Sequence, residues 1–396
     1  MINRLHGMTF LVVFFLAAIA QSQTFTTLYS FTGGSDGNLP EAGVIQDQLG
    51  NLYGTTWLGG EVQDDCNYPR GCGVVYEVNS SGTETVVHTF CTPSQCYVGN
   101  EDGIWPITPV VLDNAGNFYG TTYEGAGYGT VFKIDNAGNE TVLYNFYRGT
   151  GSVGCLPAQG LIVDNSGNLI GTTSECGSDE YPGNGSIFKI DSAGNLTVLH
   201  TFIESDGAHP YFGHLIMDNS GNLYGVTPMG GVYNAGVLYK LTTAGRLTVL
   251  HSFGRTSDGC YPWGSVVMDK AGNLYGTTHS CGSHGYGTIW KVNKKGKETI
   301  LHSFAGSPSD GCYSFAGVSR DSKGNVFGVT SGCGADNWGA LYELSASGTL
   351  TLLHSFSGTD GEYPYGEVLL TAKGELFGTA TSGGAYGYGT VWSYVP

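Results

Sequence analysis

Short runs of apolar residues, separated by turn residues, recur seven times along the chain. The clearest run is GNLYGTT, and its seven versions begin at Gly50, Gly116, Gly167, Gly221, Gly272, Gly324 and Gly374. The successive offsets are 66, 51, 54, 51, 52 and 50 residues. This self-similarity indicates a repeat architecture, so we expect residues present in every unit to hold the unit together rather than to perform one reaction.

Each unit contains four such runs, which we name a to d in chain order. Examples are GLIVD at 160–164 for a, GNLYGTT at 272–278 for b, GTVFKI at 129–134 for c and TVLHSF at 248–253 for d. Asp-x-x-Gly-Asn turns separate a from b and c from d, and this turn chemistry is typical of hairpins. Runs b, c and d are apolar on both faces, as in sheets that are packed on both sides.

Four-stranded antiparallel sheets packed face to face around an axis form a β-propeller, and seven units fall within the usual range of blades. The chain begins on a d run, 25–31, and its last unit stops on a c run, 389–396. A closed ring explains both ends, because the N-terminal strand would complete the last blade. We therefore predict an all-β fold, a seven-bladed β-propeller of four-stranded antiparallel blades closed by the N-terminal strand, as a single domain over residues 21–396.

The first twenty residues follow a different pattern. Arg4 precedes an apolar run, 8–20, that ends in Ala18, Ile19 and Ala20. This run is short for a membrane span and typical of a signal peptide. We predict a signal peptide over residues 1–20, a secreted or periplasmic location, and no membrane span.

The charge balance excludes one class of partner. Acidic residues outnumber Lys and Arg by 33 to 16, which gives a formal charge of −17, and only 12% of all residues are charged. Nucleic-acid binding requires a basic face, so we expect no nucleic-acid partner. We expect a monomer with an acidic surface.

Ten Cys in an exported chain are expected to form five disulfides. Three pairs are each 21 residues apart, with the first Cys in a d-to-a connection and the second in a b-to-c connection, which a propeller places on one face. The predicted bonds are Cys155–Cys176, Cys260–Cys281 and Cys312–Cys333, with Cys66–Cys72 and Cys91–Cys96 closing two local loops. A zinc cluster is the alternative, but the Cys spacing is not that of a zinc knuckle.

The motifs taken together resemble a known family. LHSF, SDG followed by Pro, GNLYGTT, GG and GTVFK are similar to the motifs of the GloVer-type (choice-of-anchor) tandem-repeat family of exported bacterial proteins, over residues 24–396. The resemblance implies a fold and an exported location. It implies no reaction.

Two sets of repeated polar residues have simple structural interpretations. Five His share one position of run d, where other units carry Tyr29 and Tyr144, so we expect them to be packing residues: His88, His200, His251, His302 and His354. Six units place an Asp before Gly in the d-to-a connection, and Val153 takes the seventh place: Asp36, Asp102, Asp206, Asp258, Asp310 and Asp360. Turn formation is the simpler role for these Asp, and a ring of carboxylates that binds a cation is the alternative.

The residue after the Pro that precedes run a differs between units. Counting from this Pro, or from Ser314 at its place in the sixth unit, gives Glu41, Ile107 and Ala158 in the first three units, then Tyr211, Trp263, Phe315 and Tyr365. Four aromatic residues on adjacent blades would form either a stacking platform for sugar rings or another flat ligand, or a plug in the channel. We predict that these four aromatic residues bind the ligand and that Asp258 and Asp360 add polar contacts.

The sequence leaves two hypotheses for function open. It shows no motif of a nucleophilic hydrolase, a phosphate loop or a metalloprotease helix, so catalytic residues stay unassigned and we expect neither cofactor nor metal. Four His lie outside the repeat pattern: His209, His214, His279 and His284. A metal site that they form at the mouth of the central channel, where the innermost strands begin, is a weak alternative. The first hypothesis is a non-enzymatic protein that binds a glycan or a cell-envelope component. The second is a propeller hydrolase or lyase acting on extracellular polysaccharide, because propellers host enzymes without local motifs.

Overall fold

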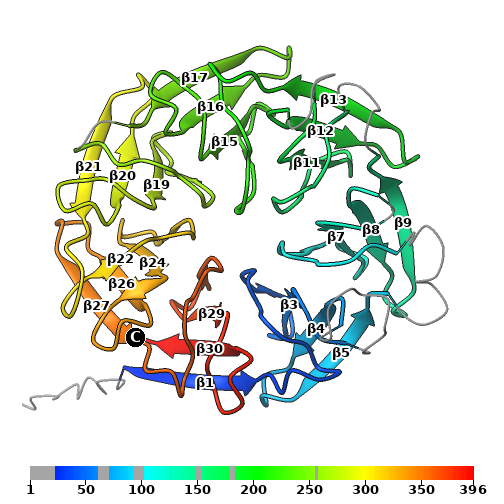
Figure 1. Ribbon diagram of the computed structural model, residues 1–396, viewed down its shortest axis with the longest axis horizontal. Helices are drawn as coiled ribbons and strands as arrows, with labels where there is room; N and C mark the ends of the chain where they lie inside the picture. Colours follow the sequence, from blue (N-terminus) through cyan, green and yellow to red (C-terminus); the bar gives the residue numbers. More distant parts are fainter. Residues whose placement is uncertain are drawn as a thin grey trace, which may run out of the picture.

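The computed structural model describes residues 23–60, 71–91, 102–125, 127–147, 153–177, 183–254 and 257–396. These residues form seven four-stranded antiparallel sheets arranged around a central axis (Figure 1). No α-helix occurs in these ranges, and they contain no helix that is long and apolar enough to cross a lipid bilayer. The predicted all-β, seven-bladed β-propeller is confirmed.

Each blade runs from a two-residue innermost strand to a six- or seven-residue outermost strand. The innermost strands are β2 (Ile45–Gln46), β6 (Val111–Leu112), β10 (Ile162–Val163), β14 (Ile216–Met217), β18 (Val267–Met268), β23 (Ser319–Arg320) and β28 (Leu369–Leu370). The second strands are β3 (Leu52–Thr56), β7 (Phe118–Thr122), β11 (Leu169–Thr173), β15 (Leu223–Thr227), β19 (Leu274–Thr278), β24 (Val326–Thr330) and β29 (Leu376–Ala380).

The outer half of each blade completes the sheet. The third strands are β4 (Val74–Val78), β8 (Thr130–Ile134), β12 (Ser186–Ile190), β16 (Val237–Leu241), β20 (Thr288–Val292), β26 (Ala340–Leu344) and β30 (Thr390–Val395). The outermost strands are β5 (Glu84–Thr89), β9 (Glu140–Asn145), β13 (Leu196–Thr201), β17 (Leu247–Ser252), β21 (Glu298–Ser303), β27 (Leu350–Ser355) and, for blade 7, β1 (Thr24–Ser30). A small extra ribbon in blade 6 pairs β22 (Gly311–Cys312) with β25 (Gly332–Cys333).

Aromatic contacts between blades explain the repeated Phe at the end of run d. Each of these seven Phe is fully buried, and its ring meets an aromatic ring on the third strand of the next blade, with centroids 5.0 to 5.9 Å apart. The second Gly of GNLYGTT makes room for that ring: a Cβ added to Gly276 would lie 2.5 Å from Trp290. The repeat motif therefore encodes the contact between blades, and edge-to-face aromatic pairs stabilise such contacts.

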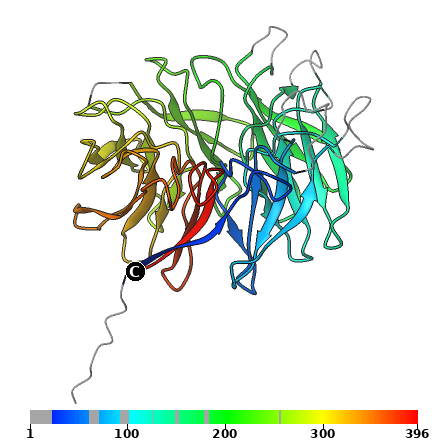
Figure 2. The same cartoon turned by 60° about the horizontal axis from the view of Figure 1, so that its bottom comes forward.

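Strand β1 closes the ring, as the sequence predicts. It pairs antiparallel with β30 from Thr24 opposite Val395 to Ser30 opposite Thr390. Figure 2 shows this first strand lying along the last blade. The Phe25 ring stacks on His354 with centroids 3.6 Å apart, so the first strand also contacts blade 6.

The Asp-x-x-Gly-Asn turns form the face where strands a and b, and strands c and d, are joined. In the turn at Asp113, one carboxylate oxygen accepts hydrogen bonds from the backbone N–H groups of Ala115 and Asn117. Burial raises the pKa of Asp113, but these bonds and those from the Asn117 amide and the Tyr119 hydroxyl outweigh it, so the pKa is lowered. We call this side of the propeller the turn face.

Candidate functional site

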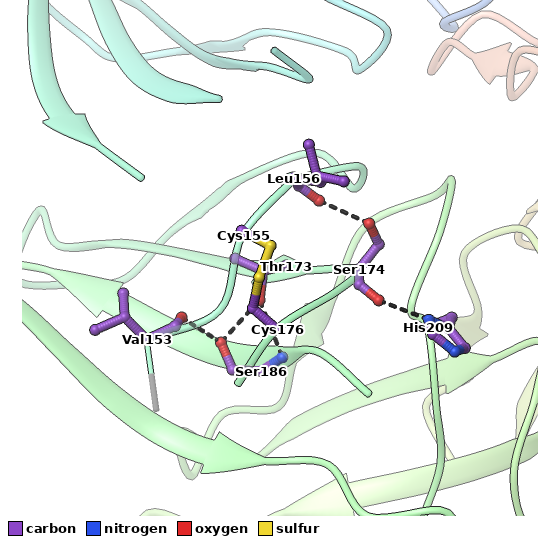
Figure 3. The surroundings of a disulfide bond; sticks show 8 residues. All are labelled: Val153, Cys155, Leu156, Thr173, Ser174, Cys176, Ser186 and His209. Atoms are coloured by element: carbon purple, nitrogen blue, oxygen red, sulfur yellow. Dashed lines mark hydrogen bonds between the residues drawn. A yellow bond between two sulfur atoms is a disulfide. The ribbon is translucent and has the colours of Figure 1, made fainter. Parts of the chain in front are cut away.

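The face opposite the turns is built from the d-to-a and b-to-c connections, which we call the loop face. Disulfides join these two connections: Cys155 to Cys176, Cys260 to Cys281 and Cys312 to Cys333, each with Cα atoms 5.4 Å apart. Around the first bond the Ser174 hydroxyl donates to the Leu156 carbonyl, and His209 Nδ1 lies 3.0 Å from the Ser174 carbonyl (Figure 3). Each bond therefore ties together the two loops of its own blade, in blades 3, 5 and 6.

The structure describes one Cys of each of the two predicted local disulfides. Cys72 and Cys91 are both disulfide-bonded. Their predicted partners, Cys66 and Cys96, lie outside the described residues, as does the predicted signal peptide. Three defined disulfides fit an oxidising, extracytoplasmic environment.

A left-handed residue stands just before the start of run a in every unit of the loop face. All seven are non-Gly residues with φ between 53° and 62°: Leu39, Trp105, Leu156, His209, Tyr261, Tyr313 and Tyr363. At Tyr261 the N–H donates to the Ala235 carbonyl of the preceding blade, and the carbonyl accepts from the His279 N–H of its own blade. Such a conformation costs about 1–2 kcal/mol per residue, and backbone bonds from two sides hold it in place.

The mouth of the central channel lies in this face and is narrow. Its lining includes one residue from each of six blades at matching positions: Glu41, Ile107, Ala158, Phe212, Phe315 and Tyr365. The space between them is only ≈ 20 Å³, which is about enough for one water molecule. The lining side chains therefore constrict the axis itself.

Counting from the Pro placed one aromatic residue in the wrong register. Blade 4 has five residues between Pro210 and the start of β14, whereas blade 5 has four between Pro262 and the start of β18. The extra residue moves Phe212, with φ 58°, into the mouth position that we assigned to Tyr211. Counting back from the strand would have identified Phe212.

The predicted aromatic residues do come together, with Phe212 among them. Ring centroids are 6.1 Å apart for Tyr211 and Trp263, 5.9 Å for Trp263 and Phe315, and 5.0 Å for Phe315 and Tyr365. Phe212 contacts the first three of these residues. We name Tyr211, Phe212, Trp263, Phe315 and Tyr365 the mouth aromatics, and all five are partly exposed.

Two titratable groups beside the mouth aromatics have displaced pKa values. Burial raises the pKa of Glu41 to about 7. Burial lowers the pKa of His279, which packs against Phe315 with centroids 4.4 Å apart, to about 4. Burial also raises the pKa of Tyr365, and nearby Glu41 raises it further. The mouth thus has a carboxyl group that changes charge near neutral pH, in apolar surroundings.

The structure does not bring Asp258 and Asp360 to the mouth aromatics. Asp258 lies 3.1 Å from His251 Nε2 on the outermost strand β17, and Asp360 lies 2.8 Å from His354 Nε2 on β27. The same pairing links His88 to Asp102, His200 to Asp206 and His302 to Asp310, while the Tyr29 hydroxyl donates to Asp36. These carboxylates hold the outer edges of the blades and form no ring around the axis.

The unit that departs from this pairing loses both partners together. Val153 stands where the other units have Asp, and Tyr144 stands at the His position of the same unit. The Asp also accepts backbone hydrogen bonds after the buried Phe, as Asp310 does from the Ala305 N–H at 2.9 Å. The pairing therefore fixes the turn out of strand d, which agrees with the structural role predicted for the His.

At three of the junctions between blades, a Glu side chain lies beside the Asp of the d-to-a connection. Glu84, Glu140 and Glu298 each open an outermost strand and lie beside Asp36, Asp102 and Asp258 of the preceding connection. Burial, and then the neighbouring Asp, raise the pKa of all three Glu, that of Glu84 to about 7. A Glu that keeps its proton can share it with the adjacent Asp.

One of these junctions is a possible arrangement of metal ligands that the sequence reasoning missed. Among the described residues, one group of His, Asp and Glu has its ligand atoms all within 4.8 Å of one another: His251, Asp258 and Glu298. The only sequence signal was a Glu at the start of run d in three units. The four His outside the repeat do not gather: for example, His284 bonds the adjacent Ser283, while His214 lies in the channel.

We expect these junction carboxyls to make stability depend on pH. Because the folded-state pKa of Glu140 and Glu298 lies above the unfolded value of about 4.3, their contribution is fully present below pH 4.3 and is lost as the pH rises through the folded pKa. The wild type should therefore lose stability between pH 5 and pH 8 that the Glu140→Gln and Glu298→Gln variants do not lose. The melting temperature of each variant minus that of the wild type should be larger at pH 8 than at pH 5. Thermal melting at both pH values measures the difference.

A surface variant controls for the loss of charge alone. Glu204→Gln lies at an exposed position. The melting temperature of this variant minus that of the wild type should be nearly the same at pH 5 and at pH 8. Comparing each variant with the wild type at each pH cancels the opposing contribution of His279 and His354, whose pKa values are lowered mainly by burial. Equal behaviour of Glu298→Gln and Glu204→Gln would show that the junction Glu ionises normally.

Comparisons with solved structures agree with the fold. A streptogramin B lyase has a TM-score of 0.58 at 12% identity, covering 94% of this chain and 97% of its own. A virginiamycin B lyase from Staphylococcus aureus has a TM-score of 0.57 at 11% identity, covering 95% and 99%. The extracellular domain of a protein described as a one-component system from B. thetaiotaomicron has a TM-score of 0.56 at 10% identity, covering 93% of this chain and 40% of its own. At these identities the likeness concerns the fold alone.

Comparisons by sequence identify the family. No curated protein matches this sequence. A family model described as the Gloeobacter/Verrucomicrobia repeat matches residues 12–182 and 157–392, which together span nearly the whole chain. The tandem-repeat resemblance seen in the motifs is thereby confirmed, and the chain belongs to the Gloeobacter/Verrucomicrobia repeat family.

Proposed function

We propose that this protein is an exported, non-enzymatic binding protein whose ligand lays a flat, weakly polar face, such as the ring of a glycan sugar, on the mouth aromatics. One observation supports this most directly: Tyr211, Trp263, Phe315 and Tyr365 stand in continuous ring contact across four adjacent blades and remain partly exposed. Aromatic side chains bury large areas at little conformational cost and pair with flat partners. The ligand would be a glycan or a cell-envelope component.

The constriction decides where such a ligand lies. Phe212, Phe315 and Tyr365 line a space of ≈ 20 Å³, so no sugar passes between them. Trp263 is not part of that lining, and Tyr261 and Tyr313 beside the run are each 38% exposed. The ligand therefore rests on the outer side of the mouth aromatics, with the constriction as its floor.

The loop face is well suited to hold such a site rigid. Three disulfides tie its loops, and the backbone bonds at the left-handed positions link each blade to the next. The turn face carries the repeated short turns instead. Binding sites benefit from a supporting framework that is already ordered before the ligand arrives.

Replacing stacking residues tests the proposal. The purified mature protein is screened on a glycan array, and the best ligand is titrated by calorimetry against Trp263→Ala and Tyr365→Ala. Stacking contributes about 1 kcal/mol per ring, so each variant should bind about fivefold more weakly. Circular dichroism checks that both variants fold.

A second tyrosine serves as the matched control. Tyr386 is 62% exposed and lies near Tyr29 of the outermost strand, away from the mouth. Tyr386→Ala should bind the ligand like the wild type. If Trp263→Ala and Tyr365→Ala both retain full affinity, the ligand does not bind at the mouth aromatics.

Glu41 favours a second candidate function, a hydrolase or lyase acting on extracellular polysaccharide. A carboxyl whose pKa is about 7 is suited to act as a general acid or base, and Glu41 lines the mouth beside the aromatic residues. Hydrolase and lyase assays on the glycans that bind distinguish the two functions. Turnover that disappears in Glu41→Gln while binding persists would establish the enzyme, and binding without turnover supports the binding protein.

The location and assembly state complete the proposal. Residues 1–20 would act as a signal peptide cleaved after Ala20, and the mature chain would be a secreted or periplasmic monomer with a formal charge of −18, since cleavage removes Arg4. The disulfides support export, because they persist in oxidising compartments.

A further inference from the structure

A second cavity lies on the axis below the constriction. It has a volume of ≈ 660 Å³ and is lined by the innermost segments of all seven blades. Ligand pockets commonly have volumes of about 300–1,000 Å³ and mainly apolar walls with a few convergent polar groups. This cavity is independent of the binding proposed at the mouth.

The cavity is closed at one end and reached from the other. It shares Gly43, Pro109 and Glu367 with the lining of the ≈ 20 Å³ constriction, so the constriction narrows the end of the cavity at the loop face. Its other end is lined by Gln46, Leu112, Val163 and Leu370, each of which directly precedes a turn of the turn face. Val163 is 38% exposed at this end, so the cavity is entered from the turn face.

The walls are apolar along most of their depth. Each blade contributes up to four successive residues, which span roughly 10–13 Å in a strand, and Val, Ile and Leu predominate, as in Val110–Leu112 and Leu161–Val163. None of the described residues that line the cavity is Lys or Arg. Such walls suit an extended apolar chain.

Three polar side chains meet at the closed end. They occupy one matching position of the repeat, where the other blades have Gly or Pro: His214, Ser265 and Glu367. The Ser265 N–H donates to Glu367 Oε1 at 2.7 Å, and Ser265 Oγ lies 2.8 Å from His214 Nδ1. Glu367 Oε2 lies 3.5 Å from the same Nδ1.

Gly317 allows this cluster to form. It lies in blade 6, between Ser265 of blade 5 and Glu367 of blade 7, and a Cβ at Gly317 would stand only 2.6 Å from Glu367 Oε1. The carboxylate can therefore cross blade 6 to reach Ser265. The Glu367 side chain is 25% exposed, which leaves part of its carboxylate accessible.

We propose that this channel binds a slender molecule with an apolar chain and a primary ammonium head, with the ammonium on Glu367 and the chain pointing to the turn face. A carboxylate at the end of an apolar channel attracts a cation that donates hydrogen bonds, since no Lys or Arg stands among the described residues of the wall. The His214 ring and the Ser265 hydroxyl lie beside the carboxylate and add polar contacts for the head group. An anionic head would meet the Glu367 charge and be rejected.

Octylammonium is the probe, titrated into the mature protein by calorimetry below its aggregation concentration. We expect one saturable site, with octanol at least tenfold weaker and octanoate without measurable binding. Glu367→Gln keeps an oxygen that can accept from the Ser265 N–H, so the variant should fold and bind octylammonium at least tenfold more weakly. Tyr386→Ala, which lies outside the lining of this cavity, should bind it like the wild type.

A second variant keeps the test sharp if Glu367→Gln fails to fold. Val163→Lys places a positive charge at the partly exposed entrance and should also weaken octylammonium binding at least tenfold, while circular dichroism stays unchanged. Three results would overturn the proposal: no saturable binding, equal binding of octanol, or full affinity in a folded Glu367→Gln or Val163→Lys variant.

Discussion

Deleting residues 24–31 from the mature protein will abolish cooperative folding. This segment supplies the outermost strand of blade 7, pairs with β30 along its length, and buries Phe31 completely against Tyr76 of blade 1. Without it, β30 becomes an exposed edge that can pair with other chains. Circular dichroism melting and size-exclusion chromatography should show a broad, early transition and aggregates.

Milder changes give the same prediction on a graded scale. Phe31→Ala should lower the free energy of unfolding by about 3–5 kcal/mol, as for other buried Phe. Thr26→Ala on the same strand, where the side chain is exposed, should cost less than about 1 kcal/mol. A protein without residues 24–31 that melts like the full mature form would show that the ring does not depend on β1.

Removing the three defined disulfides should have the second-largest effect. Each bond closes a loop over a separation of 21 residues, which corresponds to about 3 kcal/mol per bond in the chain-entropy model. Replacing Cys155, Cys176, Cys260, Cys281, Cys312 and Cys333 by Ala should lower the melting temperature well below that of the oxidised protein. Differential scanning calorimetry measures the loss.

Two measurements separate this effect from simple damage to the core. Reductant should lower the melting temperature of the wild type by more than that of the variant, because the variant keeps only the two predicted local bonds for the reductant to break. Peptide mapping without reduction should recover the three bonds. Free thiols in the oxidised protein, or bonds between different blades, would contradict the predicted pairing.

The sequence predicts the fold because the residues that form the turns and the contacts between blades recur at matching positions in the units. The Gly of each a-to-b turn, the Gly beneath the third-strand aromatic ring and the Phe at the end of run d recur seven times, and the turn Asp recurs six times, so one unit can be checked against the others. Closure by β1 follows from the same comparison, since one d run stands at the start of the chain. Local turn chemistry and long-range packing agree at these positions.

The site is harder to predict because it consists of departures from the repeat. A single inserted residue in blade 4 exchanged Tyr211 for Phe212 at the mouth, and no count from the preceding Pro reveals this. Asp258 looked available in the sequence, but its partner His251 lies on the neighbouring outermost strand. Partners that the ring brings together across blades leave no spacing signal within one unit.

The polar end of the channel illustrates the same limit. Ser265 and Glu367 are separated by 102 positions and read as ordinary polar residues before run a. Their contact depends on Gly317 in the blade between them, which the sequence shows only as one Gly among 65. Aligning the seven units by strand position, rather than by motif, is the signal that isolates them.

The paired ends of the chain make this ring a natural subject for circular permutation. Thr24 lies opposite Val395, so a short linker can join them and turn β30 and β1 into one continuous hairpin. New ends opened at the turn 191–195 would move the split blade from the seventh position to the third, whereas new ends opened near the exposed Glu204 would leave every blade built from one uninterrupted segment. The two permutants keep every side chain of the ring. The difference between their free energies of unfolding therefore measures how much stability comes from building one blade out of both ends of the chain.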